Sequence, residues 1–305
     1  MTPSPFIIAL ILNTNRRADT IECLRSLQGN HYPELLTIVL DNASVDGSKE
    51  AIAAEFPSVL VESLQVNKGY TGNNNTGIQI ALEKKADWIL VLNEDTILSA
   101  DCLEEMVRVG MSSEDVGVVG PLVYHFDEPG VIQSAGAAMG QYWISRHIGM
   151  NEKDEGQYSQ VREVDWISGC ALLIRAEALR QVDWFDERFF YYNEETDLCY
   201  RLHKQGWKLL IAPKAKLWHK GVQRNYSPSA SISYYYLRNQ LLFLKKNHAP
   251  LSVRLYNWGY FLRTVLSWSV KPKWKHMKLH RDAMLDGMRD YLLGHWGKRP
   301  DHASH

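Results

Sequence analysis

The chain has 305 residues, of which 45% are hydrophobic and 23% charged, and its formal net charge is −1 at pH 7. This is an ordinary globular composition, which excludes wholesale disorder, and the length favours one large α/β domain with an appendage. The four cysteines contain no C-x-x-C pair, so we expect reduced thiols in a cytosolic protein without a zinc site. An apolar stretch begins at Phe6 with no charged region before it, so we expect no signal peptide.

The first half of the chain alternates short apolar runs with amphipathic stretches, the pattern of βαβ units and a mostly parallel sheet. The predicted strands cover residues 6–12, 35–40, 59–64 and 88–92, and the predicted helices cover residues 19–27, 48–56 and 75–84. Polar clusters follow these strands at residues 13–15, 41–44, 67–69 and 93–95. Because ligands bind beyond the carboxyl ends of strands in open α/β sheets, four polar strand ends indicate one binding site.

The second half is less regular. We predict strands over residues 164–167, 171–174, 208–212 and 215–218, and helices over residues 194–205 and 231–246. Asn193 is expected to cap the helix over residues 194–205. Pro213 is expected to end the strand over residues 208–212. The tail from Leu251 to about Lys298 is rich in Trp, Tyr and Leu, but charged residues interrupt it. No uncharged window approaches the ~20 residues that a bilayer span requires.

Charge is distributed unevenly along the chain. The stretch from Leu198 to Arg281 holds 17 of the 34 Lys and Arg residues and no Asp or Glu. Such segregation favours an anionic partner: nucleic acid, a membrane surface or a phosphorylated ligand. For the tail, with Trp258, Phe261 and Trp268, two interpretations stay open. Its helices lie on an anionic leaflet, or they form an ordinary subdomain with the aromatic side chains packed inward.

The segment Asn93-Glu94-Asp95 follows the fourth predicted strand. A carboxylate at the end of a buried strand can hold a divalent cation, Mg²⁺ or Mn²⁺, against a diphosphate. We expect Asp95 to be the main ligand. Asn93, on the same side of an extended segment, would contribute a carbonyl or hold a metal-bound water. Asn and Asp at a strand end also commonly cap turns.

Two adjacent acids, Glu194 and Glu195, open a predicted helix. One of these carboxylates could be catalytic, by accepting the proton of an attacking hydroxyl. Alternatively, both acids only complement the helix dipole, as acids in a first helical turn commonly do. His219 by itself is more often structural than a ligand. The Gly- and Asn-rich loop at residues 67–77 suits backbone approach to a phosphate at the next helix. It lacks the G-x-G-x-x-G order, which disfavours a dinucleotide-binding enzyme.

Taken in order, these segments resemble family 2 of the inverting glycosyltransferases, which have the GT-A fold, and especially its bacterial rhamnosyltransferase-like branch. Each motif alone is weak, but the ordered set is highly specific. The motifs that carry the resemblance are Leu12-Asn-Thr-Asn-Arg16, Asp41-Asn-Ala-Ser-Val-Asp-Gly-Ser48, Asn67-Lys-Gly-Tyr70, Leu92-Asn-Glu-Asp-Thr96, Ser168-Gly169, Phe185-Asp-Glu-Arg-Phe-Phe190, Glu194-Glu195, Asp197-Leu-Cys-Tyr-Arg201 and Trp218-His219.

The resemblance implies roles for individual residues. The nucleobase, ribose and nearby donor groups would contact Asn13, Thr14, Asn15, Asp41, Asn67, Lys68, Gly69 and Asn75. Asp95 would be the metal ligand of the D-x-D element, in which Asn93 replaces the first acid, and His219 matches a histidine that helps to hold the metal. Glu195, the second acid of the pair, would be the catalytic base where the family usually has Asp, and Glu194 competes for this role.

The implied protein has a GT-A type, mostly parallel central sheet flanked by helices over residues 1–230. A C-terminal helical, basic and aromatic extension would cover residues 231–305. The implied reaction is a single in-line displacement with inversion. The donor is a nucleotide sugar, with dTDP-rhamnose favoured and UDP-sugars open, and the acceptor is a glycan or lipid-linked hydroxyl rather than nucleic acid. The enzyme would be cytoplasmic or peripheral on the inner face of the membrane.

Two other functions stay open. A sugar-nucleotide pyrophosphorylase shares the nucleotide-binding logic, but it should carry a Gly-rich loop after the first strand, whereas residues 13–17 contain no glycine. A non-catalytic carbohydrate- or nucleotide-sugar-binding homologue would explain the replacements at Asn93 and Glu195. The presence of Asp41, Asp95 and His219 argues against that second alternative.

Overall fold

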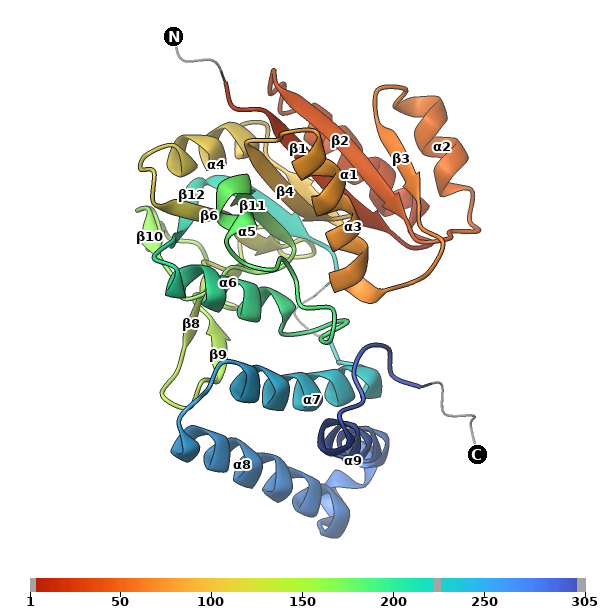
Figure 1. Ribbon diagram of the computed structural model, residues 1–305, viewed down its shortest axis with the longest axis vertical. Helices are drawn as coiled ribbons and strands as arrows, with labels where there is room; N and C mark the ends of the chain where they lie inside the picture. Colours follow the sequence, from red (N-terminus) through yellow and green to blue (C-terminus); the bar gives the residue numbers. More distant parts are fainter. Residues whose placement is uncertain (1–3, 222–225, 301–305) are drawn as a thin grey trace.

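The computed structural model describes residues 4–221 and 226–300. Its centre is a mixed sheet in the order β10-β12-β6-β11-β4-β1-β2-β3, with β5 beside β12 and β7 beside β6 (Figure 1). The strands of this sheet are β1 (Ile7–Asn13), β2 (Leu35–Asp41), β3 (Leu60–Ser63), β4 (Trp88–Asn93), β5 (Thr96–Leu98), β6 (Val116–His125), β7 (Ile132–Ser134), β10 (Arg162–Glu163), β11 (Ala171–Arg175) and β12 (Lys208–His219). A separate pair consists of β8 (Ala137–Met139) and β9 (Ser145–His147).

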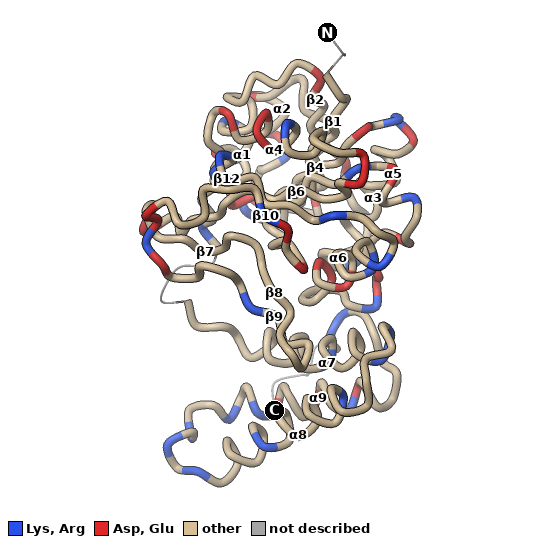
Figure 2. The backbone as a smooth tube through the Cα atoms, turned by 90° about the vertical axis from the view of Figure 1, so that its left-hand side faces the viewer, with Lys and Arg blue, Asp and Glu red and all other residues tan. Residues whose placement is uncertain are grey.

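Helices flank the sheet and form one end of the molecule. Those around the sheet are α1 (Arg17–Gln28), α2 (Ser48–Glu55), α3 (Gly69–Glu83), α4 (Cys102–Gly110), α5 (Ala176–Arg180) and α6 (Glu194–Lys204). Those at the carboxyl end of the chain are α7 (Ala230–Lys246), α8 (Leu251–Val270), the 3₁₀ helix η1 (Pro272–Met277) and α9 (Lys278–Leu293). Figures 1 and 2 show α7, α8 and α9 together below the sheet. The predicted domain boundary at residue 230, where α7 begins, stays a prediction.

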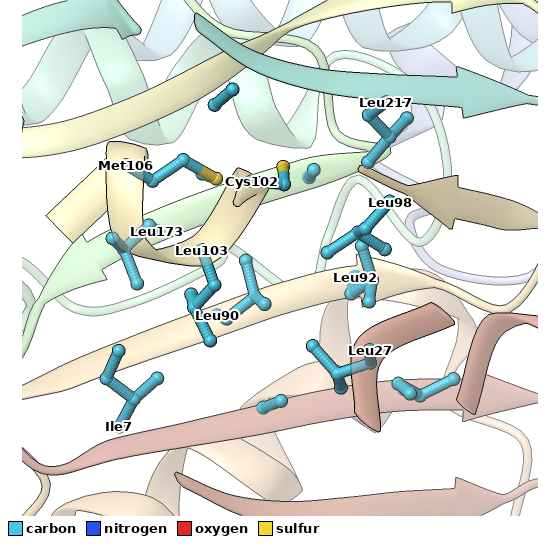
Figure 3. Close-up of a cluster of buried hydrophobic side chains, with 14 of the residues drawn as sticks. Ile7, Leu27, Leu90, Leu92, Leu98, Cys102, Leu103, Met106, Leu173 and Leu217 are labelled. Atoms are coloured by element: carbon cyan, nitrogen blue, oxygen red, sulfur yellow. The ribbon is translucent and has the colours of Figure 1, made fainter. Parts of the chain in front are cut away.

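The central strands are buried on both faces. Ile7, Ala9 and Ile11 of β1 point into one core cluster with α1 and α4, and Ile8 and Leu10 point into the other with α3, α5 and α6. Figure 3 shows the first cluster, in which leucines from the strands meet leucines from α1 and α4. Continuous apolar runs are typical of strands covered by helices on both sides, and they explain why these segments form the middle of the sheet.

The order of the parallel strands creates a switch point. β1 is parallel to both β2 and β4, and β2 is parallel to β3. The chain therefore builds the sheet outward from β1 in one direction and then continues with β4 on the other side. The crevice beyond the carboxyl ends of β1 and β4 is the place where open α/β sheets bind ligands. Beyond β4 the sheet becomes mixed, because β11 runs antiparallel to both β4 and β6.

One predicted loop is helical. α3 begins at Gly69 rather than at residue 75, so most of the Gly- and Asn-rich segment forms its first turns. The side-chain oxygen of Asn67 accepts a hydrogen bond from the Gly69 N–H at 2.8 Å, and that of Asn73 accepts one from the Lys68 N–H at 3.1 Å. These asparagines satisfy N–H groups that the start of a helix leaves without a partner, which explains the early start.

Two strand predictions for the second half of the chain were wrong. β12 continues through Pro213 to His219, because the ladder with β6 is irregular between Ala212 and Lys216 and a proline is tolerated there. The predicted strand over residues 164–167 is absent. Beyond Val164, which still donates to Leu209, the chain leaves β12.

Asn193 was predicted to cap α6 and does not. Its side chain makes no capping hydrogen bond, and its amide instead donates to Gln240 of α7 at 3.0 Å. With φ at 69°, the residue has left-handed rather than extended backbone. In the described part of the chain, no helix combines the length and hydropathy needed to span a bilayer.

Gly77 allows α3 to lie close on the sheet. A Cβ atom there would come within 2.8 Å of Leu40 and 2.9 Å of Leu10, both fully buried. We expect Gly77→Ala to lower the free energy of unfolding by about 1–2 kcal/mol, because overpacking outweighs the better helix propensity of alanine. Urea denaturation measures this. Gly130→Ala is the control, since a Cβ there meets nothing within 4 Å; an equal loss in both variants would contradict the explanation.

Candidate active site

A cavity of about 290 Å³ lies beyond the carboxyl ends of β1, β2 and β4, at the switch point. Five of the predicted site residues line it, and they come from three different segments of the chain. They are Thr14, Asn67, Gly69, Asn93 and Asp95. The cavity therefore collects the polar strand ends that the sequence indicated.

Asp95 and His219 face each other beside this cavity. Asp95 is 6% exposed and His219 is 8% exposed, and Asp95 Oδ1 lies 3.2 Å from His219 Nε2. His219 Nδ1 lies 3.0 Å from the side-chain oxygen of Gln133. That oxygen can only accept, so Nδ1 carries a proton and Nε2 is the ring nitrogen that faces Asp95. Asp95 Oδ1 is buried and makes no hydrogen bond of good geometry.

This pair fits a divalent cation. Protonated His219 would form an ion pair with Asp95, while neutral His219 and the carboxylate present two lone pairs that a cation between them would bind. Within residues 4–221 and 226–300, no group of three or more His, Cys, Asp or Glu side chains lies together as a metal site. Two protein ligands suffice for Mg²⁺ or Mn²⁺ when diphosphate oxygens and water complete the coordination shell.

Backbone pairing places His219 next to Asp95. β12 runs antiparallel to β5, with His219 opposite Thr96. The Lys220 N–H then donates to the Asp95 carbonyl oxygen at 2.9 Å. Gly221 follows, where a Cβ would come within 2.5 Å of Asp95 Oδ2, so the close approach depends on glycine.

Arg16 adjoins Asp95, and Lys220 lies next to Asp19, the other partner of Arg16. Arg16 Nη1 lies 3.6 Å from Asp95 Oδ2, and the Arg16 guanidinium also donates to Asp19 at 2.7 Å. Asp19 accepts from the Lys220 ammonium at 2.9 Å, and Glu22 accepts from the same ammonium. Arg16 therefore lines the cavity beside Asp95, while the Lys220 ammonium is held by two acids of α1. Sequence reasoning gave these residues no role, because nothing in the sequence brings α1 next to the end of β12.

Glu194 and Glu195 begin α6, and both carboxyl groups are buried. Oε2 of each has no hydrogen-bond partner. Burial raises the pKa of both side chains, and the charge of Glu195 raises the pKa of Glu194 further. A desolvated carboxyl group with a raised pKa is typical of a general base, although structural acids are also perturbed in this way.

Glu195 is connected to the cavity through Gly169. A Cβ on Gly169 would lie 3.5 Å from the Tyr70 hydroxyl and 3.8 Å from the Glu195 carboxyl carbon. The Tyr70 hydroxyl donates to the Gly169 carbonyl at 2.7 Å, and Tyr70 itself lines the cavity. The acidic pair therefore lies at the opening of α6 behind Tyr70, close to the end of β4.

The loop before α6 has an unusual backbone. Phe190, Tyr192 and Asn193 have φ values of 63°, 74° and 69°, in the left-handed region that side chains other than glycine rarely adopt. Such conformations persist only where the surroundings hold them. The loop leads directly into Glu194 and also contributes Phe190 and Tyr191 to the cavity.

Helix α7 holds this loop. The amide of fully buried Asn239 donates to the carbonyl oxygens of Tyr191 and Tyr192, both at 2.7 Å. The guanidinium of fully buried Arg238 donates to the carbonyls of Arg188 at 3.2 Å and Phe189 at 3.0 Å. Two neighbouring side chains of α7 therefore fix the approach to the acidic pair.

Other predicted donor residues do not line the cavity. Asn13 is fully buried, and its amide donates to Asp41 at 2.9 Å, so this pair ties the ends of β1 and β2 together. Asn15 and Lys68 are exposed. Asn75 exchanges two hydrogen bonds with the Phe185 backbone and lines a different cavity. Contact of these five residues with a donor stays a prediction.

Several cavity residues were missed by sequence reasoning. They are Leu12, Arg16, Asn42, Tyr70, Asn73, Glu94, Phe190 and Tyr191. All but Asn73 and Tyr191 belong to motifs that carried the family resemblance, so their proximity to predicted residues was a usable signal. Burial, followed by the charge of Asp95, raises the pKa of Glu94 to about 7.

Comparison with known proteins decides the family. The model of "Glycosyl transferase family 2" matches residues 9–183, which is more than half of the chain. The chain belongs to glycosyl transferase family 2. It is therefore a glycosyltransferase, as predicted, and the pyrophosphorylase alternative is wrong.

The similar curated proteins include rhamnosyltransferases. An N-acetylglucosaminyl-diphospho-decaprenol L-rhamnosyltransferase of Mycobacterium tuberculosis is 29% identical over 231 residues, which cover 70% of this chain and 75% of that protein. The dTDP-rhamnosyl transferase RfbF of Shigella flexneri is 27% identical over 273 residues, which cover 84% of this chain and 87% of that protein. The predicted resemblance to the rhamnosyltransferase-like branch is confirmed.

A solved structure has the same fold. The mannosyltransferase from Pyrobaculum calidifontis, in complex with GDP-Man and Mn²⁺, superposes with a TM-score of 0.60 at 13% identity. The alignment covers 96% of this chain and 88% of that one. The GT-A type α/β fold, with a central sheet flanked by helices and a C-terminal helical region, is confirmed.

The raised pKa of Glu194 has a consequence for stability. The folded protein holds a proton on this group above the pH at which the unfolded chain releases it, so its contribution to stability is lost as the pH rises. Glu194→Gln does not titrate. Relative to the unsubstituted protein, we expect this variant to gain about 1–2 kcal/mol in free energy of unfolding between pH 5 and pH 8.

Urea denaturation with a chelator present at several pH values measures this difference. Glu62→Gln is the control, because Glu62 is exposed on β3. Parallel stability curves for Glu194→Gln and the unsubstituted protein across this pH range would contradict the electrostatic account of the acidic pair.

Proposed function

We propose that the chain transfers a sugar, rhamnose in the favoured case, from a nucleoside-diphosphate donor to a hydroxyl of a glycan or lipid-linked acceptor. Asp95 and His219 would hold a divalent cation, Mg²⁺ or Mn²⁺, which would supply positive charge for the diphosphate leaving group. The observation that carries the proposal is the arrangement around one cavity at the switch point of the sheet: Asp95 lines it and faces His219, and Glu195 lies behind Tyr70, which also lines it. The family assignment makes the chain a glycosyltransferase, and the geometry of the site supports the proposed donor, cation and base.

The names of similar proteins support the choice of substrates. The Shigella relative is named a dTDP-rhamnosyl transferase, and the Mycobacterium relative is named for an N-acetylglucosaminyl-diphospho-decaprenol acceptor. The mannosyltransferase of the same fold holds Mn²⁺ with its nucleotide sugar. A dTDP-sugar donor and a lipid-linked acceptor are the combination that these relatives favour.

The donor side of the cavity suits a diphosphate. Asp95 and His219 would hold the cation, which when bound neutralises charge on the departing diphosphate. Arg16 lines the cavity beside Asp95 and would add positive charge there. Thr14 and Asn93 line the remaining wall with hydrogen-bonding groups for the nucleoside and the sugar.

The acceptor side supplies the base. Two adjacent buried carboxyl groups do not ionise together, and the pKa of Glu194 is raised by burial and by the charge of Glu195. Glu194 therefore keeps its proton while Glu195 ionises. The acceptor oxygen attacks the anomeric carbon as its proton passes to Glu195, and the bond from that carbon to the diphosphate oxygen breaks on the opposite face, which inverts the configuration.

Replacing the base tests this assignment. We expect Glu195→Gln to reduce transfer by about 10²–10⁴-fold, because the amide cannot accept the proton, while donor affinity changes little. Initial rates with dTDP-rhamnose and a short-chain N-acetylglucosaminyl diphosphate lipid, together with calorimetric titration of the donor, measure the two effects. Glu194→Gln is the matched comparison and should retain more activity. Full transfer by Glu195→Gln would refute the assignment.

Thermal shifts test the cation. We expect dTDP to raise the melting temperature more with Mn²⁺ than with EDTA, because a ligand bound only to the native state stabilises it. Asp95→Asn and His219→Ala should each remove most of the Mn²⁺-dependent increment. Asp183→Asn and His203→Ala, at exposed positions, should keep it. An increment that persists in both site variants would place the cation elsewhere.

A further inference from the structure

Helix α8 has an exposed apolar face. Side chains at intervals of four and seven residues lie along one side of the helix, as helical geometry requires. They are 68%, 61%, 47%, 62% and 72% exposed, in chain order, and we call them the outer stripe: Leu251, Leu255, Leu262, Leu266 and Val270. Exposed leucines scattered singly need no explanation, but a continuous row on one helix indicates a surface that meets an apolar partner.

The core of the C-terminal helices does not use this row. An adjoining side of α8 presents Phe261 and Val265 to a cluster with α7 and α9, and Trp258 and Trp268 pack against the same cluster. Of the two interpretations of the tail, inward packing is right for these three aromatic residues. The outer stripe is additional to that packing and is not explained by it.

Positive charge accompanies the outer stripe. Residues 251–277, which form α8 and η1, contain no acid and five exposed cations: Arg254, Arg263, Lys271, Lys273 and Lys275. In the described part of the chain, none of the five forms an ion pair with a carboxylate. Figure 2 shows Lys and Arg segments along α8 and the turn that follows it, at the lower end of the molecule.

Other cations of the acid-free stretch are used inside the protein. Lys246 lies 2.8 Å from Asp186 and 2.7 Å from Asp197, and Arg201 lies 2.8 Å from Asp197. Because carboxylates of the protein already pair with them, Lys246 and Arg201 are no evidence for an external anionic partner. Among the described residues, exposed cations without a carboxylate partner also occur at Lys204, Lys214, Lys245 and Lys278, but the five of residues 251–277 lie next to the outer stripe.

We propose that the outer face of α8, continued by η1, lies on the surface of an anionic lipid bilayer. The outer stripe would enter the headgroup region, and the lysines of η1 would contact anionic headgroups. Charge decides between occupants, because a second copy of this face would bring two sets of cations together with no acid between them. The proposal rests on this surface alone, but it would bring the enzyme to the lipid-linked acceptor of the proposed function.

Vesicle binding by the full chain tests the proposal. We expect the protein to sediment with phosphatidylcholine vesicles that contain phosphatidylglycerol, more strongly at low than at physiological salt, and weakly with phosphatidylcholine alone. Two variants, L255S/L262S/L266S and K271E/K273E/K275E, should each bind at least about tenfold more weakly. All six positions except Leu262 are more than half exposed or lie in the exposed turn, so the fold should persist.

Matched controls change exposed apolar side chains or exposed lysines elsewhere. L60S/M111S/M150S and K84E/K85E/K153E should bind vesicles like the unsubstituted protein. The thermal shift produced by dTDP with Mn²⁺ should be the same in all variants, which separates loss of the membrane surface from loss of the donor site.

Failure of the unsubstituted protein to bind phosphatidylglycerol vesicles would overturn the proposal. Unchanged binding by both L255S/L262S/L266S and K271E/K273E/K275E would also overturn it. A dimer in analytical ultracentrifugation that L255S/L262S/L266S dissociates, without vesicle binding, would assign the face to a second copy and also overturn it.

Discussion

The antiparallel pairing of β12 with β5 is the constraint on which the site depends. It sets His219 opposite Thr96 and joins the Lys220 N–H to the Asp95 carbonyl. Without this pairing, β4 would end in a single buried carboxylate, which is a poor cation site. With it, the imidazole of His219 and the carboxylate of Asp95 come together from segments far apart in the sequence. Because backbone hydrogen bonds set the register, the arrangement does not depend on the rotamers of exposed side chains.

The electrostatics of the cavity support the proposed cation. Glu94 and Asp95 line the cavity and Glu194 and Glu195 lie behind Tyr70, and burial raises the pKa of all of these acids except Asp95. A nucleotide diphosphate would be repelled by this set of acids. In the proposed site, Asp95 and His219 would hold a divalent cation beside Arg16, which would offset the charge of these acids and leave those at α6 to accept a proton. The donor diphosphate therefore requires positive charge, and the acceptor hydroxyl requires a carboxylate, within one small volume.

The family and the position of the site could be predicted from the sequence because they depend on local patterns. Polar residues after apolar runs locate the strand ends, and ordered motifs identify the family. Direct contacts could not be predicted, because Asn13 and Asp41 satisfy each other across two strands and Asn75 binds the Phe185 backbone. The support of the acidic pair by Arg238 and Asn239 was equally hidden. It depends on how α7 packs, and neither residue type signals a role by itself.

The most direct test of the account is the position of the cation in the nucleotide complex. Crystals grown with dTDP and Mn²⁺ should give an anomalous difference peak that contacts Asp95 and His219 on one side and diphosphate oxygens on the other. A peak elsewhere in the cavity, or a well-defined diphosphate bound to Arg16 and Lys220 with no metal at Asp95, would contradict the account.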